Sequence, residues 1–70
     1  MASPQAVDWT SILAQSLRDH GAADADRLAV LVVAAVEGSV AMCRTQRSTA
    51  PLDDVAAKLE SLVAARLPQR

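Results

Sequence analysis

The segment from Leu28 to Cys43, LAVLVVAAVEGSVAMC, limits what this chain can fold into, because nearly all of its residues are apolar or small. Its only charged residue is Glu37. On a helical wheel at about 100° per residue, one broad face carries Leu28, Leu31, Val32, Ala35, Val36, Ser39, Met42 and Cys43. A second, narrow strip carries only Ala34, Gly38 and Ala41. A helix that is apolar on most of its sides is buried among neighbours. We therefore expect this helix to need partners on at least two sides.

A helix is also expected before this segment, over about residues 4–19. Ser3 can cap its free N–H groups, and Pro4 suits the first helical position. Gly21 ends it, because glycine readily takes the left-handed conformation that follows a helix. Its apolar stripe, at spacings of three and four residues, consists of Trp9, Ile12, Leu13 and Leu17.

The central helix should cover about residues 25–45, with Asp24 as its N-cap. A third helix is expected over about residues 51–66, with Pro51 in its first turn and Thr49 or Ala50 as its cap. Asp54 and Lys58 can pair across one turn of it. Because no strand pattern appears, we predict an all-α fold of three helices joined by short loops.

Length and charge exclude several classes of protein. With 70 residues the chain is one domain at most. A net charge of −1 and a pI of about 5.6 give no cluster of basic residues for nucleic acid, so we expect no DNA-binding residues. One cysteine cannot form an internal disulfide, which makes the cytoplasm the default location. A membrane span needs about 20 mainly apolar residues, and the central run is shorter and charged, so we expect no membrane partner.

Gly38 gives the sharpest physical inference. Glycine inside a helix costs about 1 kcal/mol relative to alanine, so its presence between Ala34 and Ala41 needs a reason. One reading is close approach of another helix along this strip, since the distance between packed helices depends on the side chains at the contact. The other is a tolerated glycine in an alanine-rich helix. We favour close approach, because the helix has more apolar surface than two partners within one short chain can cover.

No residue pattern indicates catalysis. His20 is interpreted as a helix-ending residue, and Cys43 as a small apolar residue without metal-ligand partners. Glu37 is expected to form a structural ion pair, with Arg44 or with an arginine of a neighbouring chain. Trp9 could line a ligand cavity, but we favour a place in the core. We therefore expect no enzyme activity, no catalytic residues, no metal site and no cofactor.

A family resemblance rests on several short motifs. They are Trp9 in its leucine-spaced helix, Asp24-Ala-Asp26-Arg27-Leu28-Ala29, Val36-Glu37-Gly38-Ser39, Arg44 with Arg47, and Ala50-Pro51-Leu52-Asp53. From about Val7 to Arg66 the chain resembles the C-terminal end of TetR-family transcriptional regulators. The resemblance makes residues 1–70 a single partial domain equivalent to the last three helices of such a regulator. It also implies that Trp9 and Leu13 lie near a small-molecule effector pocket.

In that family the last two helices of each subunit form a four-helix bundle with those of a second subunit, which implies that the last two helices here form an antiparallel pair. We therefore expect a homodimer, and possible heterodimers with full-length relatives, through an interface made of Ala34, Gly38, Ala41, Leu52, Val55, Leu59 and Leu62. The family's helix-turn-helix domain does not precede Val7, so DNA binding is expected only through that absent domain. A truncated gene product, a mis-assigned start or a fragment would all fit. The alternatives are a small helical interaction module, such as an adaptor or an antitoxin-like protein, and a membrane-associated helical peptide.

Overall fold

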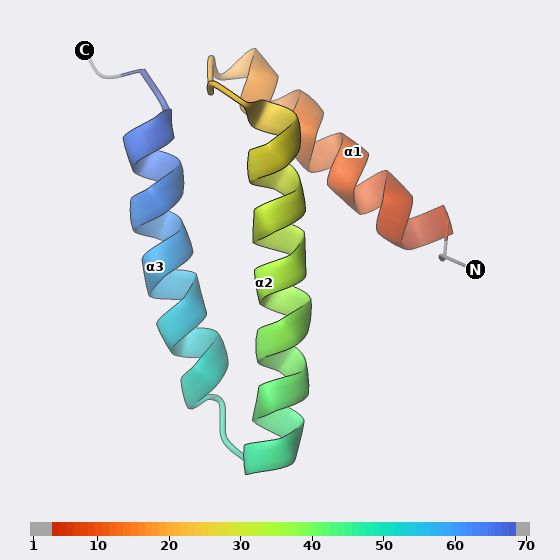
Figure 1. Cartoon of the computed structure of the whole chain (residues 1–70), viewed down its shortest axis with the longest axis vertical. Helices are drawn as coiled ribbons and strands as arrows, with labels where there is room; N and C mark the ends of the chain where they lie inside the picture. Colours follow the sequence, from red (N-terminus) through yellow and green to blue (C-terminus); the bar gives the residue numbers. More distant parts are fainter. Residues whose placement is uncertain (1–3, 69–70) are drawn as a thin grey trace.

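Three helices make up the fold, α1 (Pro4–Asp19), α2 (Ala25–Gln46) and α3 (Ala50–Arg66) (Figure 1). The computed structural model describes residues 4–68, and for residues 4–8 it describes the backbone alone. The predicted all-α fold is confirmed, and each described helix end lies within one residue of its predicted position. The expected cap by Ser3 lies outside the described residues.

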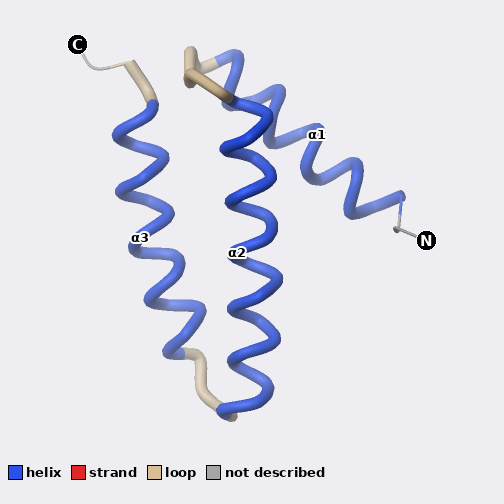
Figure 2. Tube along the Cα trace, in the orientation of Figure 1, coloured by secondary structure: helices blue, strands red, loops and turns tan. Residues whose placement is uncertain are grey.

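The helices lie side by side in one layer, with α2 in the middle (Figures 1 and 2). α3 runs antiparallel to α2, as predicted, and α1 crosses the other side of α2 at an angle. Over their described lengths α1 and α3 do not contact each other. The chain measures 40 × 32 × 12 Å along its principal axes, so it is flat. α2 therefore has a neighbour on each side within the chain, but the two faces of the layer stay open.

The buried core is small and lies at the end of the layer where α1 turns into α2. Among the residues whose burial is described, Leu17 and Leu28 are its only large side chains, each 6% exposed. The rest of the buried apolar cluster consists of Ala14, Ala25 and Ala29, with Leu62 and Val63 of α3 packed against it. Alanine buries little area, so two leucines supply most of the stabilisation in this cluster.

The α1–α2 turn depends on the backbone of Gly21. Its φ of +84° lies in the left-handed region, as predicted. The Ala22 N–H donates to the Leu17 carbonyl and the Gly21 N–H donates to the Arg18 carbonyl, both at 2.9 Å. This pair of bonds satisfies two carbonyls at the end of α1, in the pattern that usually needs glycine at this position.

Asp24 occupies the N-cap position of α2 but does not cap it with its side chain, so that part of the prediction was wrong. Its φ of 52° and ψ of 42° place it in the left-handed region, where the carboxylate makes no hydrogen bond to the first turn. Acidic charge in the first turn comes instead from Asp26, which forms an exposed ion pair with Arg18 of α1. Exposed pairs contribute at most about 1 kcal/mol, so this one assists the crossing of the helices without fixing it.

Two variants in this turn should differ in their effect on stability. Gly21→Ala should lower the free energy of unfolding by about 1–2 kcal/mol, because a side chain disfavours the left-handed region. Its Cβ would also lie 2.9 Å from Pro68 Cγ. Asp24→Gly should leave stability unchanged or raise it, since glycine adopts φ 52° without strain. Urea titration followed by circular dichroism measures both, and equal losses in the two variants would contradict this account of the turn.

α3 begins where it was predicted to begin, but its first turn is not capped by the predicted side chain. Thr49 is the N-cap and Pro51 lies in the first turn, as expected, yet Thr49 makes no side-chain cap bond. The Ala50 N–H donates instead to Ser48 Oγ at 3.1 Å. Arg47, which follows α2, has a φ of 52° and closes that helix by donating its N–H to the Cys43 carbonyl.

Asp54 and Lys58 are exposed and form no ion pair, so their predicted pairing does not occur within the described chain.

The predicted apolar stripe of α1 is only partly buried. Leu17 is buried and Leu13 is half-buried, but Trp9 is 67% exposed and Ile12 is 61% exposed. α1 meets α2 near the turn that joins them and diverges from it toward its own N-terminus (Figure 1). Placing Trp9 in the core was therefore wrong for this chain, because α2 no longer lies under α1 at that point.

Candidate functional site

The chain exposes more surface than its size requires. A folded monomer of 7.3 kDa is expected to expose about 4,200 Å², whereas this chain exposes 5401 Å². The excess of roughly 1,200 Å² exceeds the roughly 800 Å² that each partner buries in an ordinary protein interface. Exposed large apolar side chains contribute to it, namely Trp9, Ile12, Val30, Leu31, Val36 and Met42.

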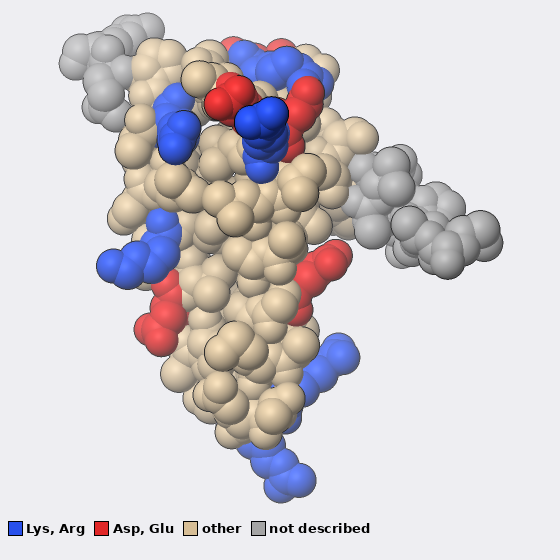
Figure 3. Space-filling view, in the orientation of Figure 1, with Lys and Arg blue, Asp and Glu red and all other residues tan. Residues whose placement is uncertain are grey.

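The predicted small-residue strip of α2 lies on one open face. Ala34, Gly38 and Ala41 are all exposed, and nothing lies within 4 Å of a Cβ built on Gly38. Figure 3 shows a face of the layer on which charged side chains lie at the ends and edges, while the middle over α2 carries none. No contact within the described chain therefore requires glycine at position 38.

The predicted interface residues of α3 lie along the seam with α2. Leu52, Val55, Leu59 and Leu62 are each half-buried, and Leu62 packs against the core cluster. Part of each side chain thus packs inside the chain and part stays open. That these residues contact a second copy remains a prediction.

A groove lies between α1 and α2 where the two helices diverge. Its lining consists of Trp9, Ile12, Leu13, Val32, Val33, Val36 and Glu37, which we call the α1–α2 groove. Its volume of about 430 Å³ falls within the ~300–1,000 Å³ of small-molecule sites. The structure places Trp9 and Leu13 together in this lining. That the groove is part of an effector pocket remains a prediction. The other five were not identified from the sequence, although a helical wheel puts Val33 and Val36 on the same side of α2.

Glu37 is exposed and is the single charged residue of this groove. The structure gives it no ion pair with Arg44 or with any other described residue, so the expected pairing within the chain was wrong. The reason is that Glu37 is exposed, so water can solvate the carboxylate without an ion-pair partner.

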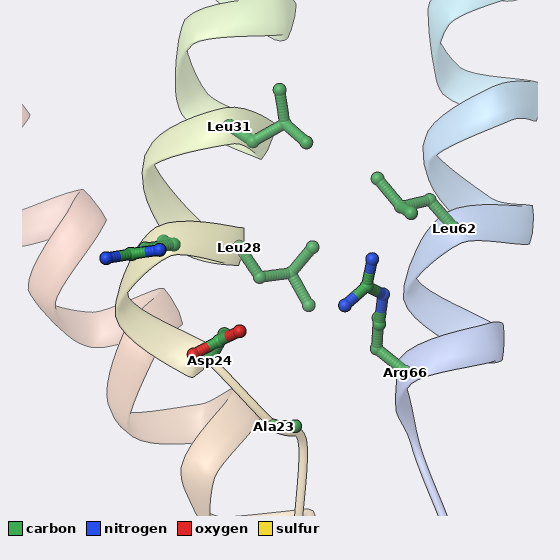
Figure 4. Close-up of a pocket in the computed structure, with 7 residues that line it drawn as sticks. Ala23, Asp24, Leu28, Leu31, Leu62 and Arg66 are labelled. Carbon is green, nitrogen blue, oxygen red and sulfur yellow. The ribbon is translucent and has the colours of Figure 1, made fainter.

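A smaller cavity of about 210 Å³ lies between α2 and α3. Figure 4 shows Leu28, Leu31 and Leu62 facing this space, with the Arg66 side chain projecting into it from the last turn of α3. Asp24 and Arg66 are both exposed. The cavity is therefore a shallow, water-accessible gap at the end of the helix pair.

The remaining candidate residues lie outside the α1–α2 groove. His20 Nδ1 lies 2.8 Å from the Ser16 carbonyl and, when protonated, donates to it, which agrees with a helix-ending role. Cys43 is a free, half-buried cysteine. Ser39 is 2% exposed and donates its Oγ proton to the Val36 carbonyl at 2.8 Å. Among the described residues, no group of three histidine, cysteine, aspartate or glutamate side chains could hold a metal ion.

Membrane insertion has to be judged from α2. Over its 22 residues, α2 is long and apolar enough to cross a bilayer by length and composition, so the argument from a short run was too strict. Its most apolar window is only 17% buried within the chain. One such helix is weak evidence for a membrane span, because helices that bury their apolar faces in a protein interface have the same composition.

The described residues thus form an all-helical layer with open apolar faces and an apolar groove. A protein-family model described as the C-terminal domain of LmrA/YxaF-like transcriptional regulators matches residues 6–58, more than half of the chain. The chain therefore belongs to the TetR family of transcriptional regulators, as a C-terminal domain, which confirms the resemblance. This is a family of regulatory domains and not of enzymes. No curated protein and no solved structure matches the chain.

Proposed function

We propose that this chain is the dimerisation and effector domain of a TetR-like regulator, and that it pairs with a second copy through α2 and α3. The family membership supports this assignment. The observation that carries it is the exposed, uncharged strip of Ala34, Gly38 and Ala41 on the middle helix of a flat layer. A layer one helix deep has no second layer to cover its apolar side chains, and a second copy would supply one.

In this proposal α2 and α3 of two copies form a four-helix bundle. Gly38 and its alanine neighbours would let the two α2 helices approach closely, while Leu52, Val55, Leu59 and Leu62 would fill the space beside them. The excess exposed surface is large enough for an interface of ordinary size. Since isolated glycine disfavours a helix, close approach also gives Gly38 a reason to be there.

The chain as given is proposed not to bind DNA by itself, because its net charge of −1 offers no basic surface. DNA binding would belong to a helix-turn-helix domain of full-length relatives, and the interface of α2 and α3 would also pair this chain with them. The proposed location is the cytoplasm. Co-purification of this chain with a tagged full-length relative would test whether the two form a heterodimer.

Sedimentation equilibrium tests the homodimer directly. We expect a mass of two chains at micromolar concentration, falling toward 7.3 kDa on dilution. The helical circular dichroism signal should weaken in the same range, because a small chain loses stability with its partner. A folded species that remains a single chain at all concentrations up to about a hundred micromolar would contradict the proposal.

A further inference from the structure

The α1–α2 groove has a charge pattern that selects one chemical class of ligand. Six of its seven lining residues are apolar, and the seventh is Glu37. No described cation pairs with this carboxylate. The groove thus combines an apolar surface with one unneutralised negative charge.

The position of Trp9 adds to this pattern. Its indole is 67% exposed and lines the same groove as Glu37. An exposed indole face attracts a cation electrostatically, in addition to offering a large apolar area. An aromatic ring and a carboxylate on opposite helices, α1 and α2, therefore both favour positive charge in the space between them.

A ligand of the opposite sign is disfavoured by the same residues. An anion would approach Glu37 against its charge, and the groove lining offers no arginine or lysine to compensate. A neutral apolar ligand would fit the valines but would gain nothing from the carboxylate. The nearby basic residue Arg44 lies outside this lining.

We propose that the α1–α2 groove binds lipophilic cations, such as organic cations that carry several aromatic rings, with Glu37 as the counter-charge and Trp9 as the stacking surface. The inference rests on the proposed function only in assigning the groove to an effector domain. It adds the chemical class of the effector. The cation seats its apolar groups against Leu13, Val33 and Val36, and its charge faces Glu37.

The single tryptophan of the chain makes the test direct, because Trp9 fluorescence reports on the groove alone. The probes are tetraphenylphosphonium and tetraphenylborate, ions of nearly the same shape and opposite charge, titrated into the whole chain. We expect tetraphenylphosphonium to change the Trp9 emission with saturation. Glu37→Gln should weaken phosphonium binding roughly fivefold and leave borate binding unchanged or stronger.

Glu60→Gln is the matched control, since Glu60 is an exposed glutamate of α3 outside the groove. It should bind both ions as the unaltered chain does. Equal phosphonium affinity in the Glu37→Gln and Glu60→Gln variants would overturn the proposal. A Trp9 emission that responds to protein concentration but not to phosphonium would also overturn it, by identifying a second copy as the occupant of the groove.

Failure of this proposal can be told apart from failure of the dimer. Sedimentation of the same samples reports the oligomeric state independently of Trp9. A monomeric chain whose phosphonium binding depends on Glu37 would contradict the proposed dimer and support the proposed ligand class. A dimer whose phosphonium binding does not depend on Glu37 would support the proposed dimer and contradict the proposed ligand class.

Discussion

Gly38→Leu is expected to convert the proposed dimer into folded monomers, with dimer affinity reduced about thirtyfold or more. Overfilling a packed contact costs roughly 1–3 kcal/mol, and a symmetric dimer places the added side chain at the interface twice. Within one chain the substitution meets no obstacle, because nothing lies within 4 Å of a Cβ at this position. It should even stabilise α2 in the monomer, since leucine favours a helix over glycine by several tenths of a kcal/mol or more.

The opposite effects on association and on helix stability make this variant informative. Ala57→Leu is the control, because Ala57 is an exposed helical residue of α3 away from its seam with α2. Sedimentation equilibrium should show a dimer for Ala57→Leu and a monomer for Gly38→Leu, with helical circular dichroism in both. A Gly38→Leu chain that still sediments as a tight dimer would place the interface elsewhere and restore the reading of Gly38 as a tolerated glycine.

Local signals in the sequence were enough to predict the three helices. Gly21 and Pro51 mark positions where the backbone needs a particular φ, and these requirements do not depend on tertiary contacts. The periodic apolar residues of α1 and α3 likewise predict helices before any packing is known. The bounds of the helices could therefore be predicted from the residues alone, whereas the antiparallel α2–α3 pair was expected from the family resemblance.

The angle between α1 and α2 could not be predicted from the sequence. The stripe from Trp9 to Leu17 is continuous at helical spacing, yet only Leu17 and Leu13 lie over α2. Which part of an amphipathic face is covered depends on where the neighbouring helix diverges, and spacing along one helix does not encode that. The same divergence creates the α1–α2 groove, so the wrong core assignment for Trp9 and the failure to identify the other five lining residues have one cause.

The charged residues were misjudged for a related reason. Glu37 was expected to be paired because the surrounding segment is apolar in sequence, but the flat layer leaves it in water. Asp24 was expected to cap α2 because its residue type favours that role, but its left-handed backbone turns the carboxylate away from the first turn. In both residues the backbone path, and not the residue type, decides what the carboxylate contacts.

Leu17→Ala is expected to unfold most of the chain at room temperature. Removing a buried leucine side chain costs about 2–5 kcal/mol, and a single small core rarely supplies more than about 3–5 kcal/mol of stability. Within the described part of the chain, the buried apolar cluster contains two leucines, and its other members are alanines that cannot expand to fill the space. The helical circular dichroism signal at 222 nm should fall to a minor fraction of that of the unaltered chain.

Ile12→Ala provides the comparison on the same helix. Ile12 is 61% exposed whereas Leu17 is 6% exposed, so its truncation removes little buried area and should change the free energy of unfolding by less than about 0.5 kcal/mol. Urea titrations of both variants at equal protein concentration measure the difference. If Ile12→Ala destabilised the chain as much as Leu17→Ala, the N-terminal half of α1 would have to be packed in solution, by a second copy or by a closer approach to α2. That outcome would remove the open α1–α2 groove, because the surface that lines it would already be covered.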